Sequence, residues 1–170
     1  MMEFGKKTYI MGILNVTPDS FSDGGEFTNV DNAIKHALEM VEQGADIIDI
    51  GAESTRPGFI EVDADTEIKR LIPVIEALKI KTNALISVDT YKSEVARKAM
   101  QSGADIINDV WGFQKDTKMA EVAAEFNCPA VVMHNQTGTE YSIEIMQSIK
   151  DFFEKTIEIA KSFMDTEFIL

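Results

Sequence analysis

A five-residue repeat joins a helix to a strand at two places in this chain and strongly constrains its fold. Gly-Ala-Asp-Ile-Ile occurs at residues 44–48 and again at residues 103–107. In each copy the glycine follows a helix-like segment, where such a residue commonly ends a helix. The two isoleucines then begin an apolar run typical of a strand buried on both faces. The repeat therefore predicts alternating strands and helices, and hence a parallel sheet.

Short apolar runs alternate with longer amphipathic segments along the rest of the chain. In the helix predicted at residues 64–78, the apolar residues share one face, and we expect the charged residues to face water. Those charged residues are Asp65, Glu67, Lys69 and Arg70. Strands are predicted at residues 9–16, 46–51, 85–89, 105–110, 129–134 and 167–170. Helices are predicted at residues 32–43, 64–78, 92–101, 118–125 and 143–164.

Polar residues at the ends of the predicted strands distinguish two parallel architectures. An open doubly wound sheet usually carries a Gly-x-Gly-x-x-Gly turn after its first strand, and this sequence has none there. A (β/α)₈ barrel instead builds its site from the carboxyl ends of many strands. Here those ends carry Asn15 and residues 53–56, 89–90, 108–109 and 134–135. The predicted fold is therefore an α/β fold of the (β/α)₈ TIM barrel type.

The length of 170 residues is short for such a barrel, which typically needs ~250. The predicted elements fill about the first five strand–helix units and the beginning of a sixth strand. We expect residues 1–170 to form one incomplete barrel domain from the N-terminal part of a longer protein. Such a domain alone leaves open sheet edges and a divided core, so association or low stability is expected.

The formal net charge of -13 restricts the partners of the chain. Nucleic acid and anionic membrane surfaces are bound by basic faces, so neither is expected, whereas a small anionic substrate can be held by local amides and cations. Cys128, the single cysteine, is interpreted as a small buried apolar residue, and the lack of an internal disulfide favours a reducing cytoplasm. The sequence has no signal-peptide pattern and no apolar run near the ~18 residues of a membrane helix.

Asp89 and Asn108 end the third and fourth predicted strands. A carboxylate accepts hydrogen bonds and a side-chain amide both accepts and donates them, so the pair suits the edge of a flat heterocycle. The alternative is that each residue caps the following helix or ties a loop. Because barrel strand ends point into a shared pocket, the presence of both favours a binding role.

Two polar loops follow the first and second predicted strands. Residues 15–25, Asn-Val-Thr-Pro-Asp-Ser-Phe-Ser-Asp-Gly-Gly, are too polar to bury and are typical of a binding loop with Phe21 in its middle. Asn15 at its start can offer an oxygen to Mg²⁺, which often takes one or two protein ligands. Residues 54–58, Ser-Thr-Arg-Pro-Gly, can hold an anion. Taken alone, however, this second motif is better interpreted as a surface turn.

Met133 and His134 end the fifth predicted strand. Met133 can pack against the face of a ligand. For His134, a structural role and a role at the pocket rim are equally compatible with the sequence.

Together these motifs give the chain a clear resemblance to the dihydropteroate synthase family, the folate-pathway enzymes that sulfonamides inhibit. The residues that carry it are 12–25, 49–58, 88–90 and 107–109, and the resemblance extends over nearly the whole chain. It implies a (β/α)₈ barrel that joins 6-hydroxymethyl-7,8-dihydropterin pyrophosphate to 4-aminobenzoate, giving 7,8-dihydropteroate and pyrophosphate. It also implies that pyrophosphate leaves first, so that a pterin cation forms.

The resemblance assigns expected roles to individual residues. Asp89 and Asn108 would hold the pterin edge, with Met133 lining that pocket. Asn15 would help to bind Mg²⁺ and pyrophosphate. The aminobenzoate and pyrophosphate site would comprise Phe21, Thr55, Arg56 and Pro57. The catalytic group would comprise Asp89, Asn108 and Arg56.

The family has further motifs that would follow Leu170. These are an Asp-Pro-Gly segment in strand 6, a lysine after strand 7, and an arginine and a histidine near strand 8. The contacts of the family's homodimer also lie mostly in the last helices. The resemblance therefore implies synthase activity and a homodimer for the longer parent protein, and no turnover by these 170 residues alone.

Two alternative functions remain open at this point. A pterin-binding methyltransferase, which moves a methyl group from a methylfolate to a corrinoid protein, shares the barrel and the pterin pocket. Such domains lack the loop at residues 15–22, which argues against this alternative. A non-catalytic fragment that still holds pterin, or that packs against a complementary half barrel, is the second alternative.

Overall fold

The computed structural model describes residues 2, 5–17, 26–53, 61–163 and 168–169. Strands and helices alternate through this part of the chain, as the repeat predicts. The strands are β1 (Met11–Asn15), β2 (Ile47–Gly51), β3 (Leu85–Asp89), β4 (Ile106–Asp109), β5 (Ala130–Val132) and β6 (Phe168–Ile169). The helices are α1 (Glu26–Glu42), α2 (Ala64–Lys81), α3 (Ser93–Gln101), α4 (Lys118–Phe126) and α5 (Ile145–Lys161).

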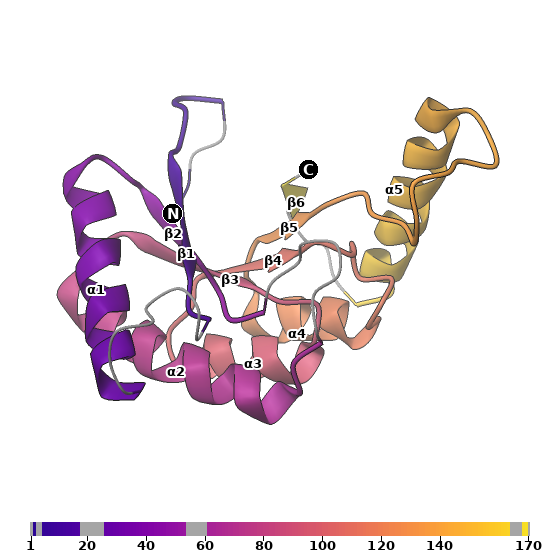
Figure 1. Cartoon of the computed structure of the whole chain (residues 1–170). Helices are drawn as coiled ribbons and strands as arrows, with labels where there is room; N and C mark the ends of the chain where they lie inside the picture. The colour runs from indigo at the N-terminus through magenta and orange to yellow at the C-terminus, as the bar shows by residue number, and fades with distance from the viewer. Residues whose placement is uncertain (1, 3–4, 18–25, 54–60, 164–167, 170) are drawn as a thin grey trace.

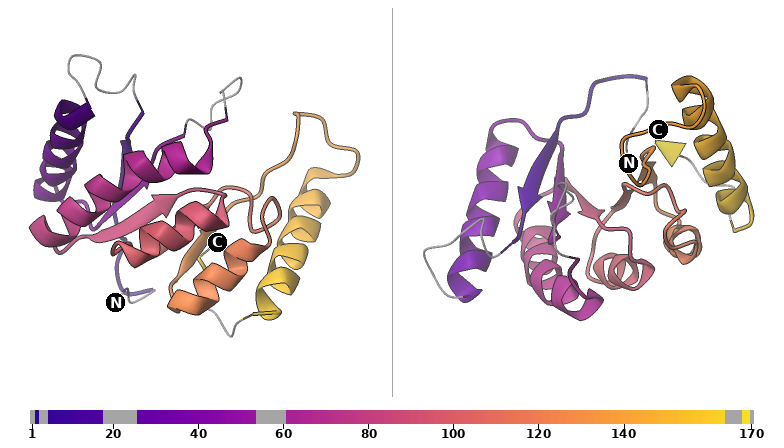
Figure 2. Two further views of the ribbon diagram at one scale, coloured as in Figure 1. Left: turned by 90° about the horizontal axis from the view of Figure 1, so that it is seen from below. Right: turned by 45° about the vertical axis from the view of Figure 1, so that its right-hand side comes forward.

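The described strands lie side by side in the order of the chain, from β1 to β6, and every neighbouring pair is parallel. The sheet is curved, and helices α1 to α5 line its outer, convex side (Figure 1). Views from below and from the side give the same arrangement (Figure 2). A doubly wound sheet would reverse its strand order and carry helices on both faces. The described elements instead form part of the wall of a (β/α)₈ barrel, which confirms the predicted fold.

The glycines of the repeat end helices α1 and α3 in the same way. Gly44 and Gly103 have φ angles of 107° and 108°, a backbone conformation that strains any residue with a Cβ atom. Both copies of the repeat therefore serve as the helix-to-strand joint that the sequence predicts.

The aspartates of the repeat tie neighbouring strands together at their amino ends. Asp46 accepts a hydrogen bond from the backbone N–H of Ile10 at 3.0 Å, and Asp105 accepts one from that of Ile86 at 2.9 Å. A lysine pairs with each of these carboxylates, Lys7 with the first and Lys79 with the second. Each copy of the repeat thus fixes the start of an adjacent strand as well as the end of its own helix.

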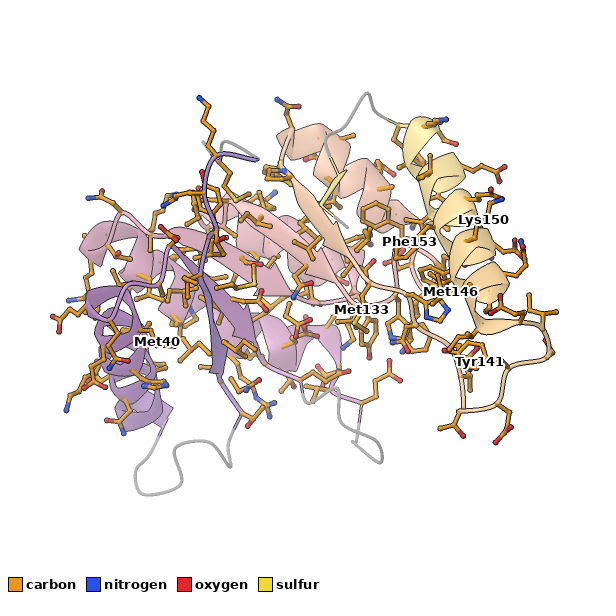
Figure 3. All side chains as sticks on the ribbon, turned by 90° about the horizontal axis from the view of Figure 1, so that it is seen from above. Met40, Met133, Tyr141, Met146, Lys150 and Phe153 are labelled. Carbon is orange, nitrogen blue, oxygen red and sulfur yellow. The ribbon has the colours of Figure 1, made fainter. Side chains whose placement is uncertain are left out.

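The hydrophobic core lies between the sheet and the helices. Gly12 on β1 faces α1, because a Cβ atom there would lie 2.8 Å from Sδ of Met40 (Figure 3). Leu14, two residues further on, is only 1% exposed, whereas Ile13 on the opposite face is 67% exposed. Cys128 is buried in this core, as expected, and burial raises the pKa of its thiol to about 11. The helices therefore bury the outer face of the sheet, while the described residues leave the inner face of β1 open.

Several element bounds differ from the sequence prediction by a few residues, and two larger differences concern α1 and the burial of Glu67. Helix α1 begins at Glu26 rather than at residue 32, and its first turns already carry Phe27 and Val30 at the helical spacing that Ile34 continues. Glu67 was expected to face water, but it is only 1% exposed. Its buried carboxylate is compensated by an ion pair with Lys92 at 2.7 Å. Among the described helices, none combines the length and the apolar character of a membrane span.

Candidate functional site

Parallel pairing in register defines two rows of side chains across the inner face of the sheet. Because Gly12 and Leu14 face the helices, their neighbours Ile13 and Asn15 face inward. The row nearest the carboxyl ends of the strands comprises Asn15, Gly51, Asp89, Asn108 and Val131. The row below it comprises Ile13, Asp49, Ser87 and Ile106. The pairing thus brings Asp89 and Asn108 side by side on one face, as the sequence predicts.

Asp89 is a carboxyl group in surroundings that disfavour its charge. Burial, together with the nearby carboxylates of Asp49, Glu67, Asp109 and Glu53, raises the pKa of Asp89 to about 7. At neutral pH the group is therefore present in both protonation states, and its neutral form can donate as well as accept a hydrogen bond.

Gly51 leaves the room that this carboxyl group occupies. A Cβ atom at Gly51 would lie 3.3 Å from Oδ2 of Asp89. Any side chain at this position on β2 would therefore crowd the carboxyl group on β3.

Asn108 reaches across the inner face to β2. Its Nδ2 donates a hydrogen bond of 2.9 Å to Oδ2 of Asp49, which is 5% exposed. Burial raises the pKa of Asp49, and the nearby Ser87 hydroxyl and Asn108 amide partly oppose that rise. Oδ1 of Asp49 and Oγ of Ser87 are buried without a hydrogen-bond partner among the described residues. Buried polar atoms in this state favour a polar ligand or an ordered water beside them.

The end of β4 is held by Asp109, whose side chain lies on the opposite face from that of Asn108. Its carboxylate accepts hydrogen bonds from the backbone N–H groups of Trp111 at 2.9 Å and Phe113 at 2.8 Å. Burial raises the pKa of Asp109 to about 6, although these two hydrogen bonds favour its ionised form. Asp109 thus fixes the loop after β4, and with it the position of Asn108.

Met133 and His134 follow β5 and point to opposite sides. Met133 is two residues beyond Val131, so it lies on the inner face, where it is 46% exposed (Figure 3). The His134 ring instead packs against Phe152 on α5, with the ring centroids 5.0 Å apart, and stacks with Tyr141 at 6.1 Å. These contacts assign His134 a structural role and place Met133 where a flat ligand could contact it.

Four of the predicted site residues lie outside the described part of the chain. They are Phe21, Thr55, Arg56 and Pro57. Their roles therefore stay predictions from the sequence.

Sequence reasoning missed Asp49 and Ser87, because it considered only the last residues of each strand. A signal was nevertheless present, since Asp49 is a charged residue within the apolar run Ile-Ile-Asp-Ile-Gly of β2. A charge inside a buried strand needs a partner or a function, because burial alone makes it costly.

A metal site formed by protein groups alone is absent from the described residues. No group of three or more His, Cys, Asp or Glu side chains is placed there to hold an ion. Asn15, exposed at the inner carboxyl end of β1, offers one amide oxygen. This fits Mg²⁺, which keeps most of its waters and binds phosphate oxygens in place of a full protein cage.

Comparison with known proteins connects this geometry to a family. Residues 11–167 match the family described as pterin binding enzyme. Curated relatives named dihydropteroate synthase, from Clostridium beijerinckii and Bacillus subtilis, are 53% and 52% identical to this chain. The alignments cover 92% and 94% of this chain but only 58% and 55% of those relatives. The chain therefore spans a little over half the length of the relatives it matches.

Solved structures of dihydropteroate synthases also match this chain over part of their length. A dihydropteroate synthase from Clostridium difficile, determined in the presence of pteroic acid, matches with a TM-score of 0.94 and 55% identity over 99% of this chain and 65% of that one. The Xanthomonas albilineans enzyme with 4-aminobenzoic acid matches with a TM-score of 0.87 and 41% identity over 94% of this chain and 59% of that one. By the extent of the family match and by these likenesses, the chain belongs to the pterin-binding enzymes, and its similarity within that family is to the dihydropteroate synthases.

Proposed function

We propose that the protein containing this chain condenses 6-hydroxymethyl-7,8-dihydropterin pyrophosphate with 4-aminobenzoate, giving 7,8-dihydropteroate and pyrophosphate. The observation that carries the proposal is the polar inner face, where Asp89 and Asn108 pair in register above the buried carboxylate of Asp49. The similarity to dihydropteroate synthases supports it. Because the chain spans 58% of the Clostridium beijerinckii relative, the activity is proposed for a protein with the remaining strands.

The pterin edge is the ligand that these side chains suit. A pterin presents ring N–H and amino donors beside a carbonyl and ring-nitrogen acceptors. A carboxylate such as Asp89 accepts from the donors, while an amide such as Asn108 can serve either kind of atom. Met133, half-exposed on the same face, would lie against the flat side of the ring. Binding through N–H donors favours the ionised carboxylate, so it would lower the pKa of Asp89 from about 7.

The pyrophosphate and the aminobenzoate would be held by residues on the first two loops. Arg56 would bind phosphate oxygens through its planar guanidinium, and Thr55, Pro57 and Phe21 would line the aminobenzoate site. Asn15 would hold Mg²⁺, which when bound supplies positive charge beside the departing pyrophosphate.

The reaction replaces one bond at the exocyclic methylene carbon of the pterin with another. The bond from this carbon to the pyrophosphate oxygen breaks first, and the electron pair leaves with pyrophosphate. The pterin left behind carries positive charge, which the carboxylates of Asp89 and Asp49 stabilise. The nitrogen of 4-aminobenzoate then forms the new bond to carbon and releases one proton. Exclusion of water is required, because water would otherwise trap the cation.

The assembly of the parent protein follows from the same proposal. We expect a homodimer acting in the cytoplasm, with small-molecule substrates as its partners and with neither nucleic acid nor a membrane among them. A non-catalytic pterin-binding role is the second candidate for the 170 residues alone, because the polar row on β3 and β4 lies entirely within them.

The test compares this chain with a completed chain. In the completed chain, the part of the Clostridium beijerinckii relative that follows its alignment with this chain is joined after Leu170. Each is titrated calorimetrically with the dihydropterin pyrophosphate and Mg²⁺, followed by 4-aminobenzoate, and each is assayed for pyrophosphate release. Turnover by the completed chain, lost on Arg56→Ala, supports the proposal. Absence of turnover rejects it. Methyl transfer from a methylfolate to a corrinoid protein would establish the methyltransferase instead.

A further inference from the structure

The orientation of the Asn108 side-chain amide is set by the group that it faces. Its Nδ2 donates a hydrogen bond of 2.9 Å to Oδ2 of Asp49, from β4 across β3 to β2. An ionised carboxylate has acceptors only, so it can bind the NH₂ end of an amide and not its oxygen. If the amide were turned over, two acceptors would face each other beside a carboxylate that is only 5% exposed. The contact therefore determines which end of the Asn108 amide faces Asp49.

The charge of Asp49 makes this contact one-sided. Burial disfavours that charge, whereas the Asn108 amide and the nearby Ser87 hydroxyl favour it. Oδ1 of Asp49 and Oγ of Ser87 are buried and lack a hydrogen-bond partner among the described residues, so nothing placed there competes with Asn108 for Oδ2. An amide at position 49 would carry a donor beside its acceptor and could pair with Asn108 in either orientation. The carboxylate thus excludes one orientation that an amide would allow.

Two groups of the Asn108 amide remain for a ligand. Asp49 uses one hydrogen of Nδ2, which leaves Oδ1 and the second N–H on a side chain that is half-buried at the inner face. Because the amide is fixed, this acceptor and this donor have fixed places. They match a ligand edge that carries a donor and an acceptor in one order. The reverse order sets donor against donor and acceptor against acceptor, and such unpaired polar groups are costly when buried.

A pterin and its dione counterpart, lumazine, differ in this order at one edge. In a pterin the ring nitrogen N1 accepts a hydrogen bond and the 2-amino group beside it donates. In lumazine an oxygen replaces the 2-amino group, so N1–H donates and the oxygen accepts. The two molecules have nearly the same size and shape, so a preference between them reports the order of donor and acceptor in the site.

We propose that Asp49 is a positioning residue that determines specificity, because it fixes the Asn108 amide in the orientation that fits the acceptor–donor edge of a pterin and rejects the reversed edge of a dione. The inference rests on the proposed function for the presence of a pterin on this face. The orientation of Asn108 itself rests only on its contact with Asp49.

Asp49→Asn separates orientation from packing. Asparagine is nearly the same size as aspartate, and its amide oxygen can still accept from Nδ2 of Asn108, so the contact is kept but its direction is no longer imposed. Glu67→Gln is the matched control. Glu67 is buried, pairs with Lys92 and, like Asp49, raises the pKa of Asp89. Its substitution therefore removes a comparable charge near Asp89 and leaves the contact between Asp49 and Asn108 in place.

The first measurement is the calorimetric affinity of the completed chain for pterin and for lumazine, in the parent sequence and in both variants. The parent should prefer pterin by about 100-fold, since the reversed edge leaves buried polar groups unpaired. In Asp49→Asn this preference should fall by about tenfold, the scale of one hydrogen bond to a charged group. In Glu67→Gln it should stay within about twofold of the parent.

Three results of the titrations would overturn the specificity role. The first is equal affinity of the parent for the two ligands, and the second is an unchanged preference in Asp49→Asn. The third is an equal fall in Glu67→Gln, because loss of a nearby charge would then account for the effect without any change in the orientation of Asn108.

The second measurement needs no ligand and no variant. In the isotopically labelled completed chain, nuclear magnetic resonance should show a scalar coupling across the hydrogen bond between Nδ2 of Asn108 and the carboxylate carbon of Asp49. One of the two Nδ2 hydrogens should also exchange more slowly with solvent than the other. Absence of the coupling together with equal exchange would overturn the fixed orientation, even where Asp49→Asn fails to fold.

Failure of the proposed function gives a different result. A completed chain that binds neither pterin nor lumazine has no pterin site on this face, and the proposed function then fails. The resonance data still decide in that case whether Asp49 orients Asn108.

Discussion

The side-chain amide of Asn108 donates a hydrogen bond of 2.9 Å to Asp49 across the inner face of the sheet, from β4 to β2. The strand between them, β3, contributes Ser87 and Asp89 to the same face. One amide therefore binds one oxygen of a buried carboxylate and at the same time lies beside Asp89, whose pKa is raised to about 7.

Removal of this amide should destabilise the fold. Asn108→Ala leaves Asp49 buried without its hydrogen-bond donor, and we expect a loss of ~1–3 kcal/mol in the free energy of unfolding. Urea denaturation at pH 7 measures it. Asn83→Ala, at an exposed position before β3, is the control and should change little. Equal losses in the two variants would contradict the role given to Asn108.

The pKa of Asp89 predicts how stability depends on pH. Its folded value of about 7 lies above the ordinary value of 3.8, so the folded state binds the proton more tightly than the unfolded state does. The contribution of this protonation to the stability of the folded state is fully present below pH 4 and is lost as the pH rises toward 7. Asp89→Asn should therefore be more stabilising at pH 8 than at pH 4, by ~2–4 kcal/mol. Denaturation of both proteins at the two pH values, with exposed Asp65→Asn as control, measures the difference.

Two glycines on opposite faces of the sheet should respond differently to alanine. Gly51→Ala places a methyl group 3.3 Å from Oδ2 of Asp89, so it should weaken pterin binding in the completed chain. Gly12→Ala directs its methyl group toward Met40 on the helix side, so it should cost ~1–3 kcal/mol of stability through overpacking and leave pterin affinity unchanged. Calorimetry and thermal unfolding of both variants separate these effects. Loss of affinity in Gly12→Ala alone would contradict the assignment of the inner face.

The second copy of the repeat offers a test of strand anchoring. Asp105→Ala removes the acceptor of the Ile86 N–H group, and we expect a loss of ~1–2 kcal/mol because a part-buried donor is left without its charged partner. Lys79→Met removes only the half-exposed ion pair and should cost under ~1 kcal/mol. If chemical denaturation ranks the two variants the other way, the ion pair rather than the backbone hydrogen bond is the main contact.

Pterin binding itself is tested at Asp89. Asp89→Ala in the completed chain should weaken binding by ~1.5–3 kcal/mol, the scale of a hydrogen bond to a charged group. Asp109→Ala is not an equivalent substitution, because Asp109 holds the backbone of Trp111 and Phe113. An unchanged dissociation constant on Asp89→Ala would remove Asp89 from the site.

The fold was predictable because its units are local. The Gly-Ala-Asp-Ile-Ile repeat and the apolar runs located every strand, and β3 was predicted with its observed bounds. The pairing of Asp89 with Asn108 followed from their places at strand ends. Asp49 and Glu67 were not predicted as buried polar groups, because their burial depends on partners distant in sequence, Asn108 and Lys92. Neither the strand period around Asp49 nor the helical period around Glu67 can reveal such a partner.

The sequential order of the strands also determines how the protein can fold. Each strand pairs with the one before it in the chain, from β1 to β6, so every pairing joins units that are adjacent in sequence. A chain emerging from the ribosome can therefore extend the sheet one unit at a time, with little loop-closure entropy for each addition. In a closed barrel, only the pairing of the first strand with the last is strongly non-local, and this step is expected to come late and to limit the folding rate.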